Sequence, residues 1–108
     1  MLFFLNDSLF TLSSIEYLAL SDICISSLQI GQMCSMKELK CLKMINSSIK
    51  EFPMVDCMQN LSVLMLCENN ISSIPIEARI LKQLSFLDVS GNPIAKNKKF
   101  IEELWMKN

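Results

Sequence analysis

The side chains that could do chemistry in this chain of 108 residues are five cysteines and eleven carboxylates, and histidine is absent. The cysteines are Cys24, Cys34, Cys41, Cys57 and Cys67. No two of them form a C-x-x-C pair, and without histidine the sequence offers neither a Cys/His zinc site nor a Ser-His or Cys-His nucleophile pair. An odd count argues against a complete disulfide framework, so we predict free, mostly buried thiols in a reducing compartment.

Other signatures of catalysis are missing from the sequence as well. Gly31 and Gly91 are its only glycines, so it contains neither a P-loop nor a Gly-x-Gly-x-x-Gly phosphate cradle. The carboxylates show no evident converging pair for acid–base work. We therefore predict a protein that is not an enzyme and that uses neither a metal ion nor another cofactor.

The composition predicts one packed domain. Hydrophobic residues make up 51% of the chain and charged residues 19%, with a net charge of −1, which excludes a disordered polar tail. The chain lacks the clustered basic excess of a nucleic-acid binder; we interpret Lys96, Lys98 and Lys99 as a solvated loop. No apolar run approaches the roughly 18 residues of a membrane span. The run Met1–Leu5 lacks the basic flank and cleavage site of a signal peptide, so we expect it to join the fold.

One spacing of apolar residues recurs along the chain. Its best-filled copy lies in residues 60–75, where leucine or isoleucine occupies positions 61, 64, 66, 71 and 74 and asparagine occupies position 69. These steps fit neither a helix face nor a simple alternating strand. They fit a short strand that turns a corner through an asparagine and returns to the same core. Copies start at Ile15, Leu39, Leu61 and Leu84, at intervals of 24, 22 and 23 residues.

This pattern resembles the leucine-rich-repeat family, whose L-x-x-L-x-L-x-x-N-x-L units recur every 20–29 residues, and within it the typical intracellular type. The resemblance divides the chain into a partial N-terminal repeat at 1–14, four repeats at 15–94 and a capping helix at 95–108. It implies an α/β solenoid. A curved parallel sheet would form the concave side, and short helices, 3-10 turns and loops the convex side.

The resemblance also gives two asparagines a structural role. Asn69 and Asn92 resemble the family's asparagine ladder, in which a side-chain amide serves as donor and acceptor for the backbone of the turns. Ser47 takes that place in the second copy, and Ile23 takes it in the first. Because an isoleucine side chain cannot form hydrogen bonds, we expect the first turn to be looser or bonded differently.

A short amphipathic helix is predicted after the last repeat. Its apolar residues are spaced at i, i+1, i+4 and i+5 and are Phe100, Ile101, Leu104 and Trp105. We expect this helix to cover the open end of the last repeat, with Phe100, Leu104 and Trp105 against the core.

The outward strand positions remain as the candidate working surface. The resemblance places them on the concave face, where such proteins bind partners. An apolar face with Tyr, Phe and Met is typical of a protein interface; a cover from a larger chain, or drift under weak constraint, would produce the same face. We expect Cys41 and Cys67 to be small apolar fillers there. The predicted partner-binding residues are Tyr17, Cys41, Lys43, Ile45, Val63, Met65, Cys67, Phe86 and Asp88.

The sequence thus favours a cytoplasmic, non-catalytic scaffold that binds another protein, with no nucleic acid and no membrane span; the partner could also be the rest of a longer leucine-rich-repeat chain. One alternative is a fragment of an extracellular receptor, in which the sequons at Asn6, Asn46, Asn60 and Asn70 would carry glycans. Another is a substrate-selecting segment of a larger enzyme, such as a kinase or a ubiquitin ligase.

Overall fold

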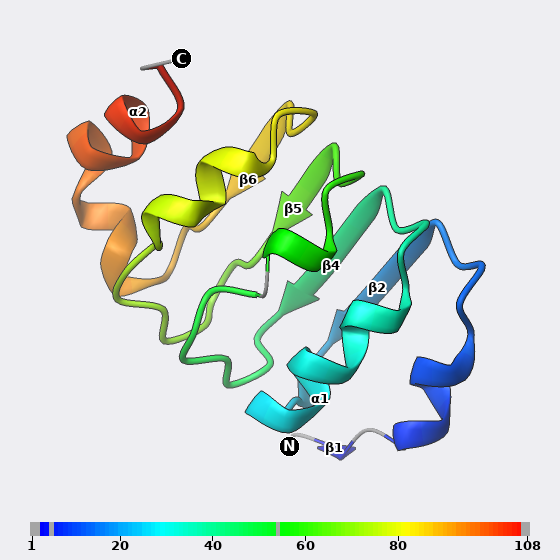
Figure 1. Ribbon diagram of the computed structural model, residues 1–108. Coiled ribbons are helices and arrows are strands. Elements are labelled where there is room, and N and C mark those ends of the chain that lie inside the picture. The colour runs from blue at the N-terminus through cyan, green and yellow to red at the C-terminus, as the bar shows by residue number, and fades with distance from the viewer. Residues whose placement is uncertain (1–2, 5, 54, 107–108) are drawn as a thin grey trace.

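Four short parallel strands form the centre of the molecule. The computed structural model describes residues 3–4, 6–53 and 55–106. The strands are β2 (Tyr17–Ser21), β4 (Cys41–Ile45), β5 (Val63–Met65) and β6 (Phe86–Asp88), and they lie side by side in the order of the sequence (Figure 1). An α/β architecture with a parallel sheet is therefore confirmed.

The register of the sheet follows the sequence repeat. Tyr17 pairs with Cys41, Cys41 with Val63, and Val63 with Phe86. Each of these residues lies two positions after the start of its unit, so equivalent positions stand next to one another. A slip by one residue would turn every inward leucine outward, which is why the apolar pattern fixes this register.

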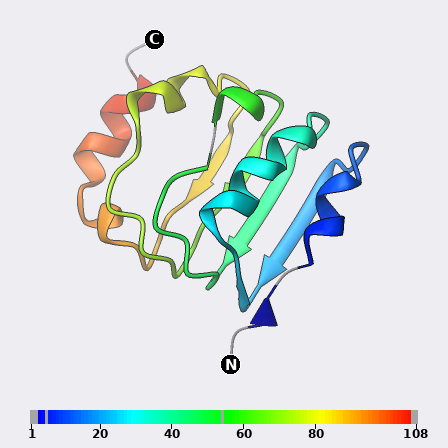
Figure 2. The same ribbon diagram turned by 60° about the horizontal axis from the view of Figure 1, so that its bottom comes forward.

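Short helical segments lie between the strands and after the last one, and most of them cross one face of the sheet (Figure 2). Most are 3-10 helices of three to five residues, the short length in which this helix type usually occurs. Two segments are α-helices, and the one between β2 and β4 begins at a capping box formed by Ser26 and Gln29. The segments are η1 (Asp7–Thr11), α1 (Ser27–Gln32), η2 (Met33–Ser35), η3 (Val55–Cys57), η4 (Ile76–Ile80), η5 (Pro93–Lys96) and α2 (Lys98–Met106).

The core fills the space between the sheet and these segments. Leu42 and Met44 of β4, Leu64 of β5 and Leu66 directly after β5 point inward with no exposed surface. Met33, Met36, Met58 and Leu81 meet them from the connections and are also fully buried. Burying each such side chain contributes about 1.5–3 kcal/mol.

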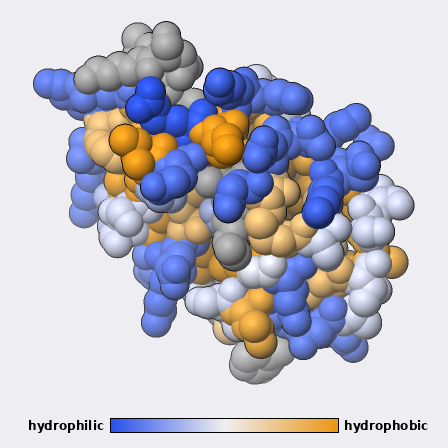
Figure 3. All heavy atoms as spheres, viewed as in Figure 1, coloured by the Kyte–Doolittle hydropathy of each residue, from blue (hydrophilic) through white to orange (hydrophobic). Residues whose placement is uncertain are grey.

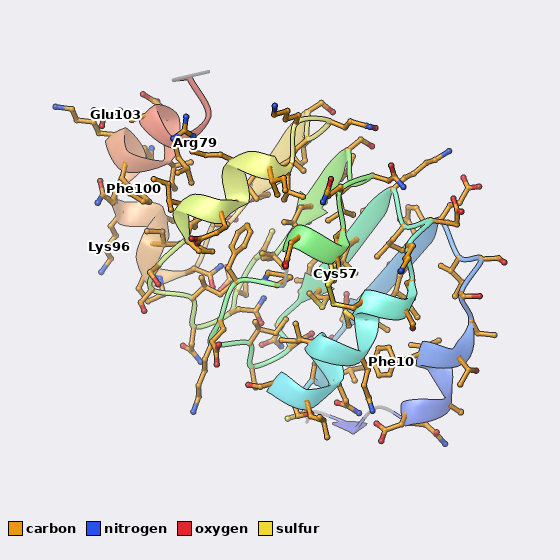
Figure 4. All side chains as sticks on the ribbon, in the orientation of Figure 1. Phe10, Cys57, Arg79, Lys96, Phe100 and Glu103 are labelled. Carbon is orange, nitrogen blue, oxygen red and sulfur yellow. A yellow bond between two sulfur atoms is a disulfide. The ribbon has the colours of Figure 1, made fainter. Side chains whose placement is uncertain are left out.

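The N-terminal side of this core is well covered. Within the described part of the first five residues, β1 (Phe3–Phe4) pairs in parallel with β3 (Ile23–Cys24), as expected if this run belongs to the fold. Phe10 reaches from η1 toward α1 and is 5% exposed (Figure 4). The inward residues of β2, Leu18 and Leu20, are each only 7% exposed.

The turn after each strand has the same backbone conformation in all four units. Asp22, Asn46, Glu68 and Gly91 occupy equivalent positions, and their φ angles are 59°, 53°, 58° and 74°. This left-handed conformation costs a residue with a side chain about 1 kcal/mol or more. Glycine fills the place in the last unit only, so the first three turns must be held by their hydrogen bonds.

Asn69 supplies those bonds at the middle of the sheet. Its Oδ1 accepts from the backbone N–H groups of Ser47 (2.9 Å) and Ile49 (3.2 Å) in the preceding unit. Its Nδ2 donates to the carbonyl oxygens of Met44 (2.8 Å) and Leu66 (2.9 Å). One buried amide thus joins two neighbouring units.

Asn92 repeats this arrangement one unit later. Its Oδ1 accepts from the N–H of Ile71 (2.9 Å), and its Nδ2 donates to the carbonyl oxygens of Leu66 (2.7 Å) and Val89 (3.0 Å). For the first unit, the residue at the equivalent acceptor position is Ser47, which has no side-chain amide, and the N–H of Ile25 donates to its backbone carbonyl instead (3.2 Å). The first turn is therefore bonded differently, as expected, but the reason is the serine at position 47 and not Ile23.

The prediction that all five cysteines are free thiols is wrong for one pair. Cys34 and Cys57 form a disulfide between the connections of two neighbouring units (Figure 4), with their Cα atoms 5.0 Å apart. They are 23 residues apart in the sequence, close to one repeat interval, and stacking of the units brings them together. Cys24, Cys41 and Cys67 are free and partly buried.

The helix after the last unit is α2. Leu104 is buried at 6% exposure, whereas Phe100 is 37% exposed and lies largely outside the core. The side chain of Trp105, which we expected to shield the core, lies outside the described residues.

Candidate interface on the open face of the sheet

The outward residues of the four strands form what we call the open sheet face. Two rows of this face follow from the register. The first row is Tyr17, Cys41, Val63 and Phe86, and the second is Ala19, Lys43, Met65 and Asp88. Ile45 lies opposite Ser21 at the end of β4, and Cys67 follows β5. The structure therefore brings all nine residues predicted for partner binding to one side of the sheet.

Aromatic side chains mark the two ends of the first row. Tyr17 is 58% exposed on β2, and Phe86 is 49% exposed on β6. Between them, Cys41 and Val63 are partly buried, as is Met65 in the next row. The middle of the face is thus a continuous apolar strip with an accessible ring at each end.

One charge on this face is held by an aromatic ring. The Lys43 ammonium lies 5.3 Å from the centre of the Tyr17 ring, within the range of a cation–π contact. A side-chain hydrogen bond with Tyr17 raises the pKa of Lys43. Lys43 is therefore a cation held beside the Tyr17 ring.

The opposite charge lies across Met65. The Asp88 carboxylate accepts a hydrogen bond from the backbone N–H of Ser90 at 3.0 Å. This bond lowers the pKa of Asp88, since it stabilises the charged form. Lys43 and Asp88 both stand opposite Met65, so a fixed cation and a fixed anion flank an apolar centre.

The free thiol at Cys67 is poorly suited to nucleophilic chemistry. Its Sγ lies 4.0 Å from the Asp88 carbonyl oxygen, and burial raises the pKa of the thiol. Little of it is therefore thiolate at neutral pH. Among the described residues, no group of three or more His, Cys, Asp or Glu side chains could hold a metal ion.

Sequence reasoning missed a second surface feature, an open groove at the C-terminal edge of the sheet. Its lining includes Ile76 and Ile80 from η4, Leu84 and Leu87 from the last unit, and Ile101 from α2. Ile76 and Ile80 are 62% and 40% exposed, so η4 presents apolar side chains to solvent. Only the position of α2 reveals that they remain uncovered.

Comparison of the sequence with protein-family models gave no match, and comparison with curated proteins gave none either. Within the described residues, the structure has no helix long and apolar enough to cross a membrane. The fold and the surface together define a small α/β protein whose parallel sheet is covered on one face and open on the other.

Proposed function

We propose that this protein is a leucine-rich-repeat solenoid that binds another protein through the open sheet face and performs no catalysis. The observation that carries the proposal is the apolar strip between Tyr17 and Phe86, with Lys43 and Asp88 fixed on either side of Met65. Exposed aromatic and methionine side chains in one patch favour protein recognition. Flanking charges of opposite sign fix the orientation of a partner more than they add affinity.

The repeat assignment rests on features that recur in register. Each unit places its strand, its left-handed turn residue and its inward leucines at equivalent positions. The side chains of Asn69 and Asn92 bridge neighbouring units with similar bonds. These features support stacking of one structural unit, in which each copy contacts its neighbours.

Site-specific photo-crosslinking tests the proposed interface. A photoreactive amino acid at position 65 should capture a partner protein from cells, and the same group at Leu28 on α1, which is 73% exposed, serves as the matched control. The captured protein is then purified and titrated against the chain. Met65→Glu combined with Phe86→Glu should weaken its binding at least about tenfold, while circular dichroism shows that the double variant is folded. Unchanged affinity in the folded double variant would remove the open sheet face from the proposal.

The disulfide supports a second candidate, a repeat protein of an oxidising compartment. Disulfides persist mainly in secreted and periplasmic proteins or in the endoplasmic reticulum, and the proposed cytoplasmic location rested on reading all cysteines as thiols. Alkylation of the protein in freshly lysed cells, followed by mass spectrometry, distinguishes a cytoplasmic location from an oxidising compartment. Alkylated Cys34 and Cys57 would support the cytoplasm, whereas an intact bond with glycans on the exposed sequons would support the extracellular alternative.

A further inference from the structure

Among the described residues, the core is partly uncovered at the outer edge of β6. This strand is the last of the sheet, and β5 is its neighbour on the inner side. The inward residues of its unit are less protected than their equivalents one unit earlier. Leu84 and Leu87 are partly exposed, whereas Leu61 and Leu64 have no exposed surface. The apolar surface formed by Leu84 and Leu87 at the edge of β6 is therefore accessible to solvent.

A groove of about 1350 Å³ runs along this edge. Its apolar lining comes from β6, from η4 through Ile76 and Ile80, and from α2 through Ile101. Figure 3 shows apolar atoms gathered over η4 beside α2, and Figure 4 places Arg79 between those two elements. Charges of both signs surround the groove, including Glu77, Lys82, Lys98 and Glu102. This mixture suits a ligand of low net charge and disfavours a polyanion.

The backbone at this edge repeats a bonding pattern that neighbouring units complete. The Lys40 carbonyl accepts from the N–H groups of Ser62 (2.8 Å) and Val63 (3.2 Å), and the Ser62 carbonyl accepts from those of Ser85 (2.9 Å) and Phe86 (3.1 Å). In the other direction, the N–H groups of Leu66 and Glu68 donate to the carbonyls of Asp88 and Ser90.

The equivalent groups of the last unit have no following strand in the described part of the chain. They are the carbonyl of Ser85 and the N–H groups of Val89 and Gly91. Unpaired backbone groups in a row along a strand edge are a template for another strand.

We propose that this edge groove binds an extended segment of a partner protein as a fifth parallel strand beside β6. Backbone pairing would use the Ser85 carbonyl and the N–H groups of Val89 and Gly91. Apolar side chains of the segment, spaced by three and then two residues, would cover Leu84, Leu87 and Val89 as each unit covers the one before it. The inference does not rest on the proposed function, since the groove and the open sheet face share only the edge of β6.

A peptide copied from this chain is the probe. It spans residues 59–72 with Cys67→Ser, carries a fluorophore, and is titrated into the 108-residue protein while anisotropy is recorded. Saturable binding is expected. N-methylation at both the Ser62 and the Val63 amides removes the two donors that would reach the Ser85 carbonyl, and should weaken binding about tenfold or more. N-methylation at the Leu66 amide is the matched control, because that group points to the next unit and away from β6; binding should change less than about threefold.

Variants of the protein locate the site. Ile80→Glu in the groove should weaken peptide binding at least about tenfold, whereas Leu28→Glu on α1 and Met65→Glu on the open sheet face should leave it unchanged. The last variant separates this proposal from the proposed function. Absence of saturable binding, equal losses from the two N-methylated peptides, or self-association of the protein that excludes the peptide would each overturn the proposal.

Discussion

Replacing Asn69 by alanine tests how far the buried amide bridges hold the molecule together. The side chain is 5% exposed, and its Oδ1 is the acceptor for the N–H groups of Ser47 and Ile49, two residues with 0% and 1% exposure. Leaving a buried donor without a partner costs about 1–3 kcal/mol. The two buried N–H groups left without an acceptor, together with the cavity left by the side chain, should lower the free energy of unfolding by about 4 kcal/mol. That is a large share of the roughly 5–15 kcal/mol expected for a domain of this kind.

Two further variants calibrate this value. Asn92→Ala deprives one such N–H, that of Ile71, of its acceptor, so its cost should be about 2 kcal/mol. Ser47→Ala removes a hydroxyl that donates to the Ile45 carbonyl at 3.2 Å, and should cost about 1 kcal/mol. Urea unfolding followed by circular dichroism gives all three values, provided that the slope of the transition is unchanged. Equal costs for Asn69→Ala and Ser47→Ala would refute the bridging role.

Asn69→Asp adds a test through pH. A carboxylate at this position would face the carbonyl oxygens of Met44 and Leu66 in a buried site, which raises its pKa in the folded state. The variant should therefore be least stable at neutral pH. It should gain stability as the pH falls through that raised value toward the ordinary pKa of about 4. A loss of stability over the same pH range, relative to the wild type, would contradict this account.

Three more predictions concern the disulfide, the last turn and Asp88. Cys34→Ser with Cys57→Ser should lower the free energy of unfolding by about 3 kcal/mol, the loop-closure value for a bond spanning 23 residues; a wild type whose unfolding is insensitive to dithiothreitol would contradict it. Gly91→Ala should cost about 1–2 kcal/mol, because φ is +74°, while the exposed Glu68 carboxyl group near an added Cβ can move aside; an unchanged free energy of unfolding would contradict the strain assigned to this turn. The lowered pKa of Asp88 provides stability that is fully present above about pH 4 and is lost as the pH falls through the folded value, so Asp88→Asn should flatten the acid side of the curve, and an unchanged curve would argue against the Ser90 contact.

Much of the fold could be predicted because the repeat spacing encodes it locally. The alternation in each strand assigned Leu42 and Leu64 to the core and Lys43 and Met65 to the outside, since successive side chains of a strand point to opposite faces. The interval between copies then predicted which residues pair across the sheet. The rows of the open sheet face followed from those two facts, and the structure places all nine predicted residues on one side.

The disulfide could not be assigned from the cysteine count. Cys34 and Cys57 meet because two connections stack, and each connection has its own length and helical content, so the relevant contact depends on the packing of whole units. The interval of 23 residues was a usable signal, but it gains meaning only when the stacking is known. The odd number of cysteines pointed away from it.

The sequence by itself determined the strands, the register and the outward rows, because these depend on periods of two residues and of one unit that each copy carries within itself. Only the tertiary structure decided what happens where the repetition ends. The amphipathic spacing at Phe100, Ile101 and Leu104 predicts a helix and an apolar side. It does not state where that helix docks, because docking depends on the summed shape of η4, β6 and the last turn. That position leaves Leu84 and Leu87 partly uncovered and creates the groove beside β6.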